Sequence, residues 1–211
     1  MAASSSMSHS GMSHSGGMVH VAAAIEQLIK NSKPTHVALK SGAWSAASTW
    51  EGGRIPGSGA NVLIGKGKTV TYDRESKDKL NTIAIRGNLK FATGKDTELF
   101  VETIINAPEG TLDIGSASRG VDADKKARIV FTSDRAINTG RDPQQLGKGL
   151  VSHGEVNIYG ADKQDKVRLA KDASAGDTTL TFKDSLKGWQ IGDEIVLAGT
   201  SYRYNENDKT N

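Results

Sequence analysis

Residues 41–73 read SGAWSAASTWEGGRIPGSGANVLIGKGKTVTYD and hold two tryptophans, several glycines and one proline. Glycine reaches positive φ without steric cost and proline fixes φ, so both residues favour turns. Trp44 and Trp50 each add a large apolar ring whose N–H needs a partner when it is buried. The stretch therefore predicts an ordered loop, anchored by tryptophan, that runs into alternating β-strand sequence.

A glycine-led pattern of alternating polar and apolar residues follows this loop. It reads GNLKF at 87–91, GTLDI at 110–114 and GEVNI at 154–158. The first two copies begin 23 residues apart and the last two 44, close to twice that spacing. Short strands that repeat at this period and are split by turns are typical of stacked β-solenoid coils. The pattern predicts an all-β fold of parallel coils with Leu89, Leu112 and Val156 inside.

The order of these segments resembles the eight-glycine (G8) domain family. The resemblance rests on Trp44, STW at 48–50, IPGSG at 55–59 and the glycine-led copies, and it continues into GWQIGDEIVLAGTS at 188–201. It implies a right-handed parallel β-helix outside the cytoplasm that is often linked to glycans. The family includes a hyaluronidase, but that activity needs more sequence than this chain contains. The resemblance therefore assigns no catalytic residue, and the catalytic residues stay unknown.

Four regions are expected along the chain. Residues 1–18, rich in Ser, Gly, Met and His, are predicted to be a disordered leader. Residues 19–33 are predicted to form a short amphipathic helix that caps the first coil, whose strand edge would otherwise be unpaired. Its apolar face would comprise Val21, Ala24, Ile25, Leu28 and Ile29. Residues 34–204 would form the β-helix domain, which continues further in related sequences, and 205–211 a tail.

Composition narrows the functional classes. The chain has 211 residues and a net charge of +3, with 27 basic and 24 acidic residues interspersed. This charge pattern gives no support for nucleic-acid binding. The absence of cysteine excludes disulfides, thiolate metal sites and thiol nucleophiles. No apolar run reaches the length of a membrane span and no signal peptide is visible, while the resemblance favours a secreted, periplasmic or cell-surface location.

The leader carries a possible metal site. MSHSG at 7–11 is repeated at 12–16, and Met18 and His20 follow. Thioether sulfur suits Cu(I), while imidazole suits Cu(II), Ni(II) and Zn(II). The sequence therefore predicts copper binding by Met7, His9, Met12, His14, Met18 and His20. The alternative is a solvated leader or a tail introduced by cloning.

The tryptophans are candidate glycan contacts. Trp44, Trp50 and Trp189 could stack on sugar rings, or they could be buried anchors for loops, since tryptophan is usually highly buried. Paired carboxylates are the usual machinery of glycosidases. Asp113 is expected to stack in one column with Lys90 and Asn157, because neighbouring strands lie about 4.8 Å apart. No convincing carboxylate pair follows from this placement.

Three functions remain open. The first is a non-catalytic, glycan-associated β-helix module of a surface or secreted protein, and it is preferred. The second is a copper-binding protein that uses the Met/His array on a β-helical scaffold. The third is a polysaccharide hydrolase or lyase, hyaluronidase-like, or a fragment of one. The partners implied are a polysaccharide or a copper ion.

Overall fold

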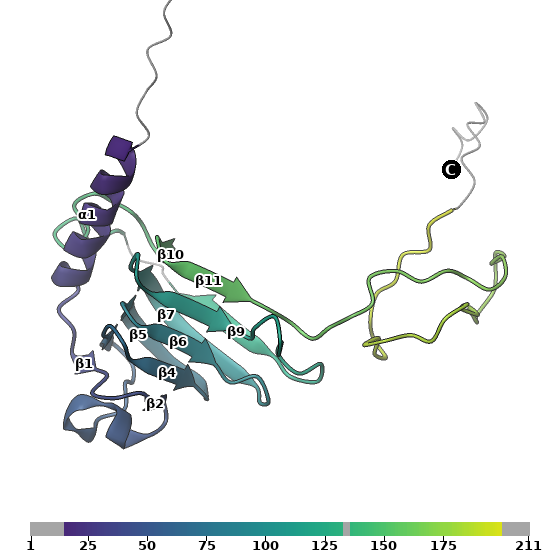
Figure 1. Ribbon diagram of the computed structural model, residues 1–211, viewed down its shortest axis with the longest axis horizontal. Coiled ribbons are helices and arrows are strands. Elements are labelled where there is room, and N and C mark those ends of the chain that lie inside the picture. The colour runs from purple at the N-terminus through teal and green to yellow at the C-terminus, as the bar shows by residue number, and fades with distance from the viewer. Residues whose placement is uncertain (1–14, 133–135, 200–211) are drawn as a thin grey trace, which may run out of the picture. The chain divides into compact units, whose positions relative to one another are not determined.

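Two parallel sheets, between which the chain passes repeatedly, form the framework of the fold (Figure 1). The computed structural model describes residues 15–132 and 136–199. The chain divides into two compact units, residues 1–161 and 162–211. The first sheet runs in the order β1 (His36–Val37), β3 (Asn61–Ile64), β5 (Glu75–Ile85), β7 (Thr97–Asn106) and β10 (Gly149–Ser152), with β9 (Ala127–Phe131) also paired to β7. The second runs in the order β11 (Glu155–Ile158), β8 (Thr111–Ile114), β6 (Asn88–Phe91), β4 (Thr69–Tyr72) and β2 (Gly42–Ala43).

The register between coils confirms the predicted interior column. Leu89 pairs with Leu112, and Leu112 pairs with Val156, all in parallel strands. Leu89 and Leu112 are fully buried, and Val156 packs against the same core. Side chains alternate between the two faces of a strand. Once the strands pair in this register, the other apolar residues at alternate positions of each strand also face the core. The all-β class and the parallel strands predicted from the sequence are thus confirmed.

Glycines lead these strands because the backbones of successive coils touch at this corner. A Cβ added to Gly87 would lie 2.3 Å from the carbonyl oxygen of Lys68. A Cβ on Gly110 would lie 2.3 Å from that of Ile85. Real Cβ atoms do not approach oxygen so closely, so any side chain would force the coils apart. Close approach, repeated once per coil, explains the glycine period.

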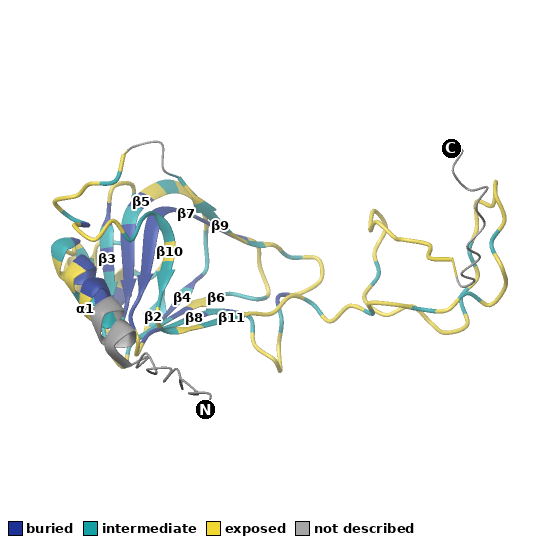
Figure 2. Ribbon diagram, turned by 90° about the horizontal axis from the view of Figure 1, so that it is seen from above, coloured by how far each residue is buried: buried dark blue, intermediate teal, exposed yellow. Residues whose placement is uncertain are grey.

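The two long strands of the first sheet bend in the middle. Leu80 and Ile83 both face the core, as do Val101 and Ile104. In a straight strand, residues three apart point to opposite faces, so each strand must turn between these positions. The first half of β7 pairs with β9 and its second half with β10. Figure 2 shows the strands arranged as a ring around the core.

The helix is present, but its position differs from the prediction. The helix α1 (Ser15–Asn31) begins inside the region expected to be a leader. Ile25, Leu28 and Ile29 pack against Ala84 and Ile105. Figure 2 shows α1 lying along the outer face of the first sheet. The predicted capping of the first coil is therefore wrong. Since this outer face is itself apolar, a helix that crosses several strands buries more apolar surface than one placed over a single edge.

The first coil is closed by the tryptophan loop instead. This loop contains two short 3₁₀ turns, η1 (Ala47–Thr49) and η2 (Glu51–Gly53), and folds back so that Trp50 bridges Ala38 of the first coil. Trp44 lies edge-on to Trp50 at 4.8 Å and to Tyr72 of the next coil at 5.1 Å between ring centroids. At the opposite end of the stack, within the first unit, Ile158 of the last strand β11 is 67% exposed.

The second unit contains an antiparallel pairing of two extended segments. The backbone N–H of Gln164 donates to the carbonyl of Lys187 at 3.1 Å, and that of Lys183 donates to Arg168 at 2.9 Å. Leu169 and Phe182 form an antiparallel bridge next to the second contact. One register fits all of them, so residues 164–170 and 181–187 run antiparallel as a loose hairpin with a single β-bridge and a long connecting loop.

Candidate functional site

Trp44 and Trp50 are core residues. They are 2% and 1% exposed, and Trp50 Nε1 donates a hydrogen bond of 2.8 Å to the carbonyl oxygen of Trp44. A ring buried this deeply cannot stack on a sugar. The interpretation of these two residues as glycan platforms is therefore wrong. Their large apolar rings close the first coil instead.

Trp189 lies in a different environment. It is half-buried and lines a hollow of about 1310 Å³ that is formed within residues 163–199. Its Nε1 donates to the carbonyl oxygen of Gln164 at 2.7 Å, and its ring lies edge-on to Phe182 at 5.8 Å. The hydrogen bond holds the indole in place beside the hollow. Its role as a sugar platform stays a prediction.

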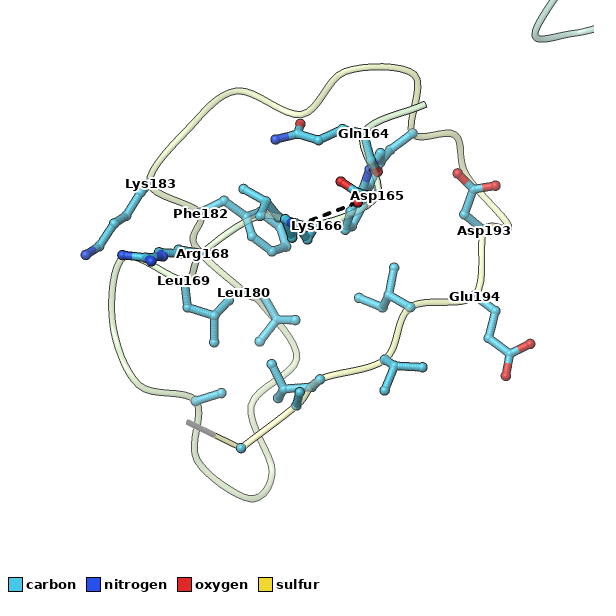
Figure 3. A pocket seen from close by; sticks show the side chains of 18 of the residues that line it. Gln164, Asp165, Lys166, Arg168, Leu169, Leu180, Phe182, Lys183, Asp193 and Glu194 are labelled. Atoms are coloured by element: carbon cyan, nitrogen blue, oxygen red, sulfur yellow. Dashed lines mark hydrogen bonds and ion pairs between the residues drawn. The ribbon is translucent and has the colours of Figure 1, made fainter. Parts of the chain in front are cut away.

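Apolar and charged side chains share the walls of this hollow. Leu169 and Phe182 from the hairpin and Leu180 from its connecting loop line the hollow, together with charged residues from both segments (Figure 3). Lys163 Nζ lies 2.6 Å from Asp193 Oδ1, and this contact holds the pKa of Asp193 below its ordinary value. Asp193 also accepts a 2.7 Å hydrogen bond from the backbone N–H of Gln190. The ionised carboxylate thus pins the turn that follows Trp189.

A polar row crosses the outer face of the second sheet. It comprises Asn88, Lys90, Asp113, Glu155 and Asn157. Asp113 pairs in register with both Lys90 and Asn157, which confirms the column predicted from the repeat. Asn88 Nδ2 and Asn157 Nδ2 donate to the two oxygens of Asp113 at 3.0 and 2.9 Å. The carboxylate is therefore held between two amides.

Two glutamates on the first sheet each form ion pairs with two basic side chains. Glu98 pairs with Lys77 and, at 3.0 Å, with Arg128. The hydrogen bond from Lys77 lowers the pKa of Glu98, and Lys77 Nζ also lies 4.9 Å from the centre of the Phe100 ring. Glu102 is almost fully buried and contacts Lys148 at 2.9 Å and Arg141 at 3.5 Å. These contacts fasten the segment between β9 and β10 to the sheet.

Asn106 is a structural residue that the repeat pattern did not identify. It is fully buried, and its Nδ2 donates to Ser152 Oγ and to the carbonyl oxygen of Glu155, both at 3.0 Å. It thus ties the end of β7 to the turn and strand of the next coil. The sequence does hold one signal for this role. Asn106 follows the apolar pair Ile104–Ile105 at the position that Ile85 occupies in the preceding coil.

Most of the predicted copper site lies outside the described residues. Met7, His9, Met12 and His14 precede residue 15, and Met18 and His20 lie in the first turns of α1, where side chains are not described. Across residues 15–132 and 136–199, no group of three or more His, Cys, Asp or Glu could hold a metal ion. Within the same residues, no helix has both the length and the apolar character needed to cross a membrane.

Comparison with known proteins identifies the family. The profile of the G8 domain matches residues 49–170, more than half of the chain. The chain therefore belongs to the G8 domain family, as its glycine-led strands predicted. No solved structure matches it.

Three relatives share its sequence along most of its length. Human Fibrocystin-L is 30% identical over 171 residues, which cover 79% of this chain and 4% of the relative. Fibrocystin of Canis lupus familiaris is 28% identical over 174 residues, covering 78% of this chain and 4% of the relative. A G8 domain-containing protein of Dictyostelium discoideum is 24% identical over 177 residues, covering 80% of this chain and 12% of the relative. The chain thus spans a small part of the proteins it resembles.

Proposed function

We propose that this chain is a non-catalytic module of a secreted or cell-surface protein and that it binds glycans. The carrying observation is Trp189, a half-buried indole beside a hollow that also has charged walls. Aromatic rings combined with a few fixed polar groups are the usual composition of small-molecule sites. Membership of the G8 family supports the extracellular assignment. The hydrolase or lyase alternative has no residue assigned to it.

We also infer that the coils wind as a right-handed β-helix. Crossovers join parallel strands through the opposite sheet, as from β5 through β6 to β7. Connections between parallel strands are right-handed in the great majority of proteins, because the strands themselves twist in one sense.

The glycan proposal is tested by binding of the full chain to immobilised oligosaccharides. Trp189→Ala should abolish or strongly weaken capture, because it removes the stacking surface. The control is Tyr159→Ala, which deletes a partly exposed aromatic ring in the first unit. Equal capture by wild type and Trp189→Ala would show that the hollow is not the binding site. No capture by any variant would contradict the glycan function itself.

Copper binding by the Met/His array is the second candidate. The specific observation is the direct repeat MSHSG, which supplies thioethers and imidazoles in alternation. This mixture should favour Cu(I) over Zn(II), since zinc gains little from thioether sulfur. Cu(I) titration against a competing chelator should show that the full chain binds more tightly than a variant with Met7, His9, Met12 and His14 all changed to Ser. Equal affinities would leave the array as a solvated leader.

A further inference from the structure

The loose hairpin of the second unit gives the hollow a wall that is mainly apolar. Leu169 and Phe182 form its bridge, so their side chains lie on the same face of the pair. Both line the hollow, and so does Leu180. Arg168 and Lys183 are the neighbouring residues on the two segments, and Figure 3 shows their side chains extending away from the hollow. The hairpin therefore presents its aliphatic and aromatic face to the hollow and its basic face to the outside.

The segment that follows Asp193 adds a second apolar wall. Ile195, Val196 and Leu197 line the same hollow. All three side chains are exposed, and Val196 is 90% exposed. Apolar surface in contact with water is unfavourable, so a ligand group that covers these side chains gains free energy from the area it buries.

Fixed polar groups lie in another part of the hollow. The indole N–H of Trp189 is bonded to the carbonyl oxygen of Gln164, and the turn that follows Trp189 contains the ionised carboxylate of Asp193. Figure 3 shows Gln164 on one side of Phe182 and Leu180 on the other. An indole face and a fixed carboxylate suit a sugar, whose C–H groups pack on the ring and whose hydroxyls donate to the carboxylate.

The two parts of the hollow require different ligand groups. A sugar laid on the aliphatic walls would lose hydrogen bonds to water without gaining others, which is costly. A hydrocarbon alone would cover the carboxylate of Asp193 without offering it a donor, which is costly for the same reason. At about 1310 Å³ the hollow is larger than most ligand sites, which measure roughly 300–1,000 Å³. It therefore has room for a sugar and an apolar chain together.

We propose that the ligand of this hollow is a glycan that carries an alkyl or acyl chain. The inference rests on the proposed glycan function and specifies the ligand of the same site. The sugar stacks on Trp189 and donates hydrogen bonds to Asp193, while the chain lies against the hairpin and residues 195–197. Affinity grows with each methylene group that the apolar walls remove from water.

NMR titration of the full chain with matched glycosides tests the proposal. The probes are the methyl and octyl β-glycosides of glucose, galactose and N-acetylglucosamine, all below their micelle concentrations, and octanol as a chain without a sugar. For at least one sugar, the octyl glycoside should bind roughly tenfold or more tightly than the methyl glycoside. It should shift the indole N–H signal of Trp189 and the methyl signals of Leu180 together. Equal affinities would overturn the role of the chain and leave the glycan function standing.

Two exposed aliphatic residues of the same unit supply the matched variants. Val196 lines the hollow, whereas Ile191 is fully exposed and is not among the residues that line it. Val196→Gln should weaken binding of the octyl glycoside roughly fivefold or more and leave the methyl glycoside unaffected. Ile191→Gln should change neither affinity. Since neither side chain is buried, both variants should fold as the wild type does.

The remaining outcomes separate this proposal from the glycan function. Equal losses in the two variants would show that the chain adheres to exposed apolar side chains rather than to the hollow, which overturns the proposal alone. Octanol that binds as tightly as the octyl glycosides would show that the sugar contributes nothing, which overturns both the proposal and glycan binding at this hollow. If no glycoside binds, neither stands.

Discussion

At the scale of single residues, one glycine and one asparagine determine how closely neighbouring coils pack and how they are held together. Gly110 permits backbone contact with the preceding coil, and Asn106 ties β7 to the coil that follows. The glycine could be predicted from its period alone. The asparagine could not, because a single polar residue at the end of an apolar run is equally compatible with an exposed turn. Burial of Trp44 and Trp50 was likewise beyond the sequence, since a loop tryptophan can close a core or face a ligand.

Gly110→Ala should destabilise the protein. The new methyl group would lie 2.3 Å from the carbonyl oxygen of Ile85, so the two coils would have to separate. Overpacking of this kind typically costs about 1–3 kcal/mol. Chemical denaturation measures the effect. The matched control is Gly65→Ala, where no atom lies within 4 Å of the added carbon. Equal stability of the two variants would contradict close packing at the corner.

Leu112→Ala should lower the free energy of unfolding by about 2–5 kcal/mol, because Leu112 is fully buried between Leu89 and Val156 and the truncation leaves a cavity. Thermal and chemical denaturation measure the loss. The control is Leu39→Ala, since Leu39 is a largely exposed leucine in the same unit. A loss below about 1 kcal/mol would argue against a continuous interior column.

At the scale of elements, the sequence identified the apolar face of α1 but not the surface it contacts. The pattern Ile25, Leu28, Ile29 says only that one side of the helix must be buried. The target is a patch built from Ala84 and Ile105, which are distant in sequence and meet only after the coils have stacked. Ala84 is fully buried in the cluster that α1 forms with the sheet. Such complementarity belongs to the tertiary structure, so no local pattern could predict it.

Leu28→Asp should destabilise the first unit and promote aggregation. The substitution places a charge against the apolar outer face of the first sheet, and burying an unpaired charge is strongly unfavourable. The matched control is Gln27→Asp on the exposed side of the same helix. The melting temperature and the elution volume in size-exclusion chromatography report the two effects. A Leu28→Asp variant that matches the control in both would rule out packing of α1 on the sheet.

Glu98 should make stability depend on pH under acidic conditions. Its pKa is lowered from 4.5 by the hydrogen bond from Lys77 and by the charge of Arg128. Its contribution is therefore complete above about pH 4.5 and is lost as the pH falls through the lower folded-state value. Glu98→Gln should flatten the dependence of unfolding free energy on pH below that point. If the unfolding free energy of Glu98→Gln depends on acidic pH as it does in the wild type, the ion pairs of Glu98 add nothing to stability.

At the scale of the whole molecule, the two units differ in how well they are packed. The first unit has a core that extends across all of its coils, and the second rests on one hairpin around a hollow. An isolated two-stranded hairpin is marginally stable in water. The sequence predicted strand segments at 178–182 and 195–197, but no strand of three or more residues forms within residues 162–199, where Leu169–Phe182 is an isolated bridge. Pairing between segments distant along the chain depends on the tertiary structure.

Hydrogen exchange should reveal this difference directly. Amides of β5 and β7 should exchange slowly, because their hydrogen bonds lie between other strands of the first sheet. Amides of residues 164–170 and 181–187 should exchange much faster, since local opening of a hairpin exposes little apolar surface. Mass spectrometry of peptides from both regions measures the rates. Equal protection would show that the second unit is as stable as the first.

The coils of the first unit are stacked in the order of the sequence, from the coil closed by the tryptophan loop to the one that contains β11. The end sealed by Trp44 and Trp50 is the one that the ribosome delivers first. Each later coil can then pair with the coil that precedes it in the sequence, which has already folded. The chain between the two paired strands is short, so little loop has to be closed. We therefore expect the coils to fold in the order in which they are synthesised, with β11, which contains Ile158, joining the stack last.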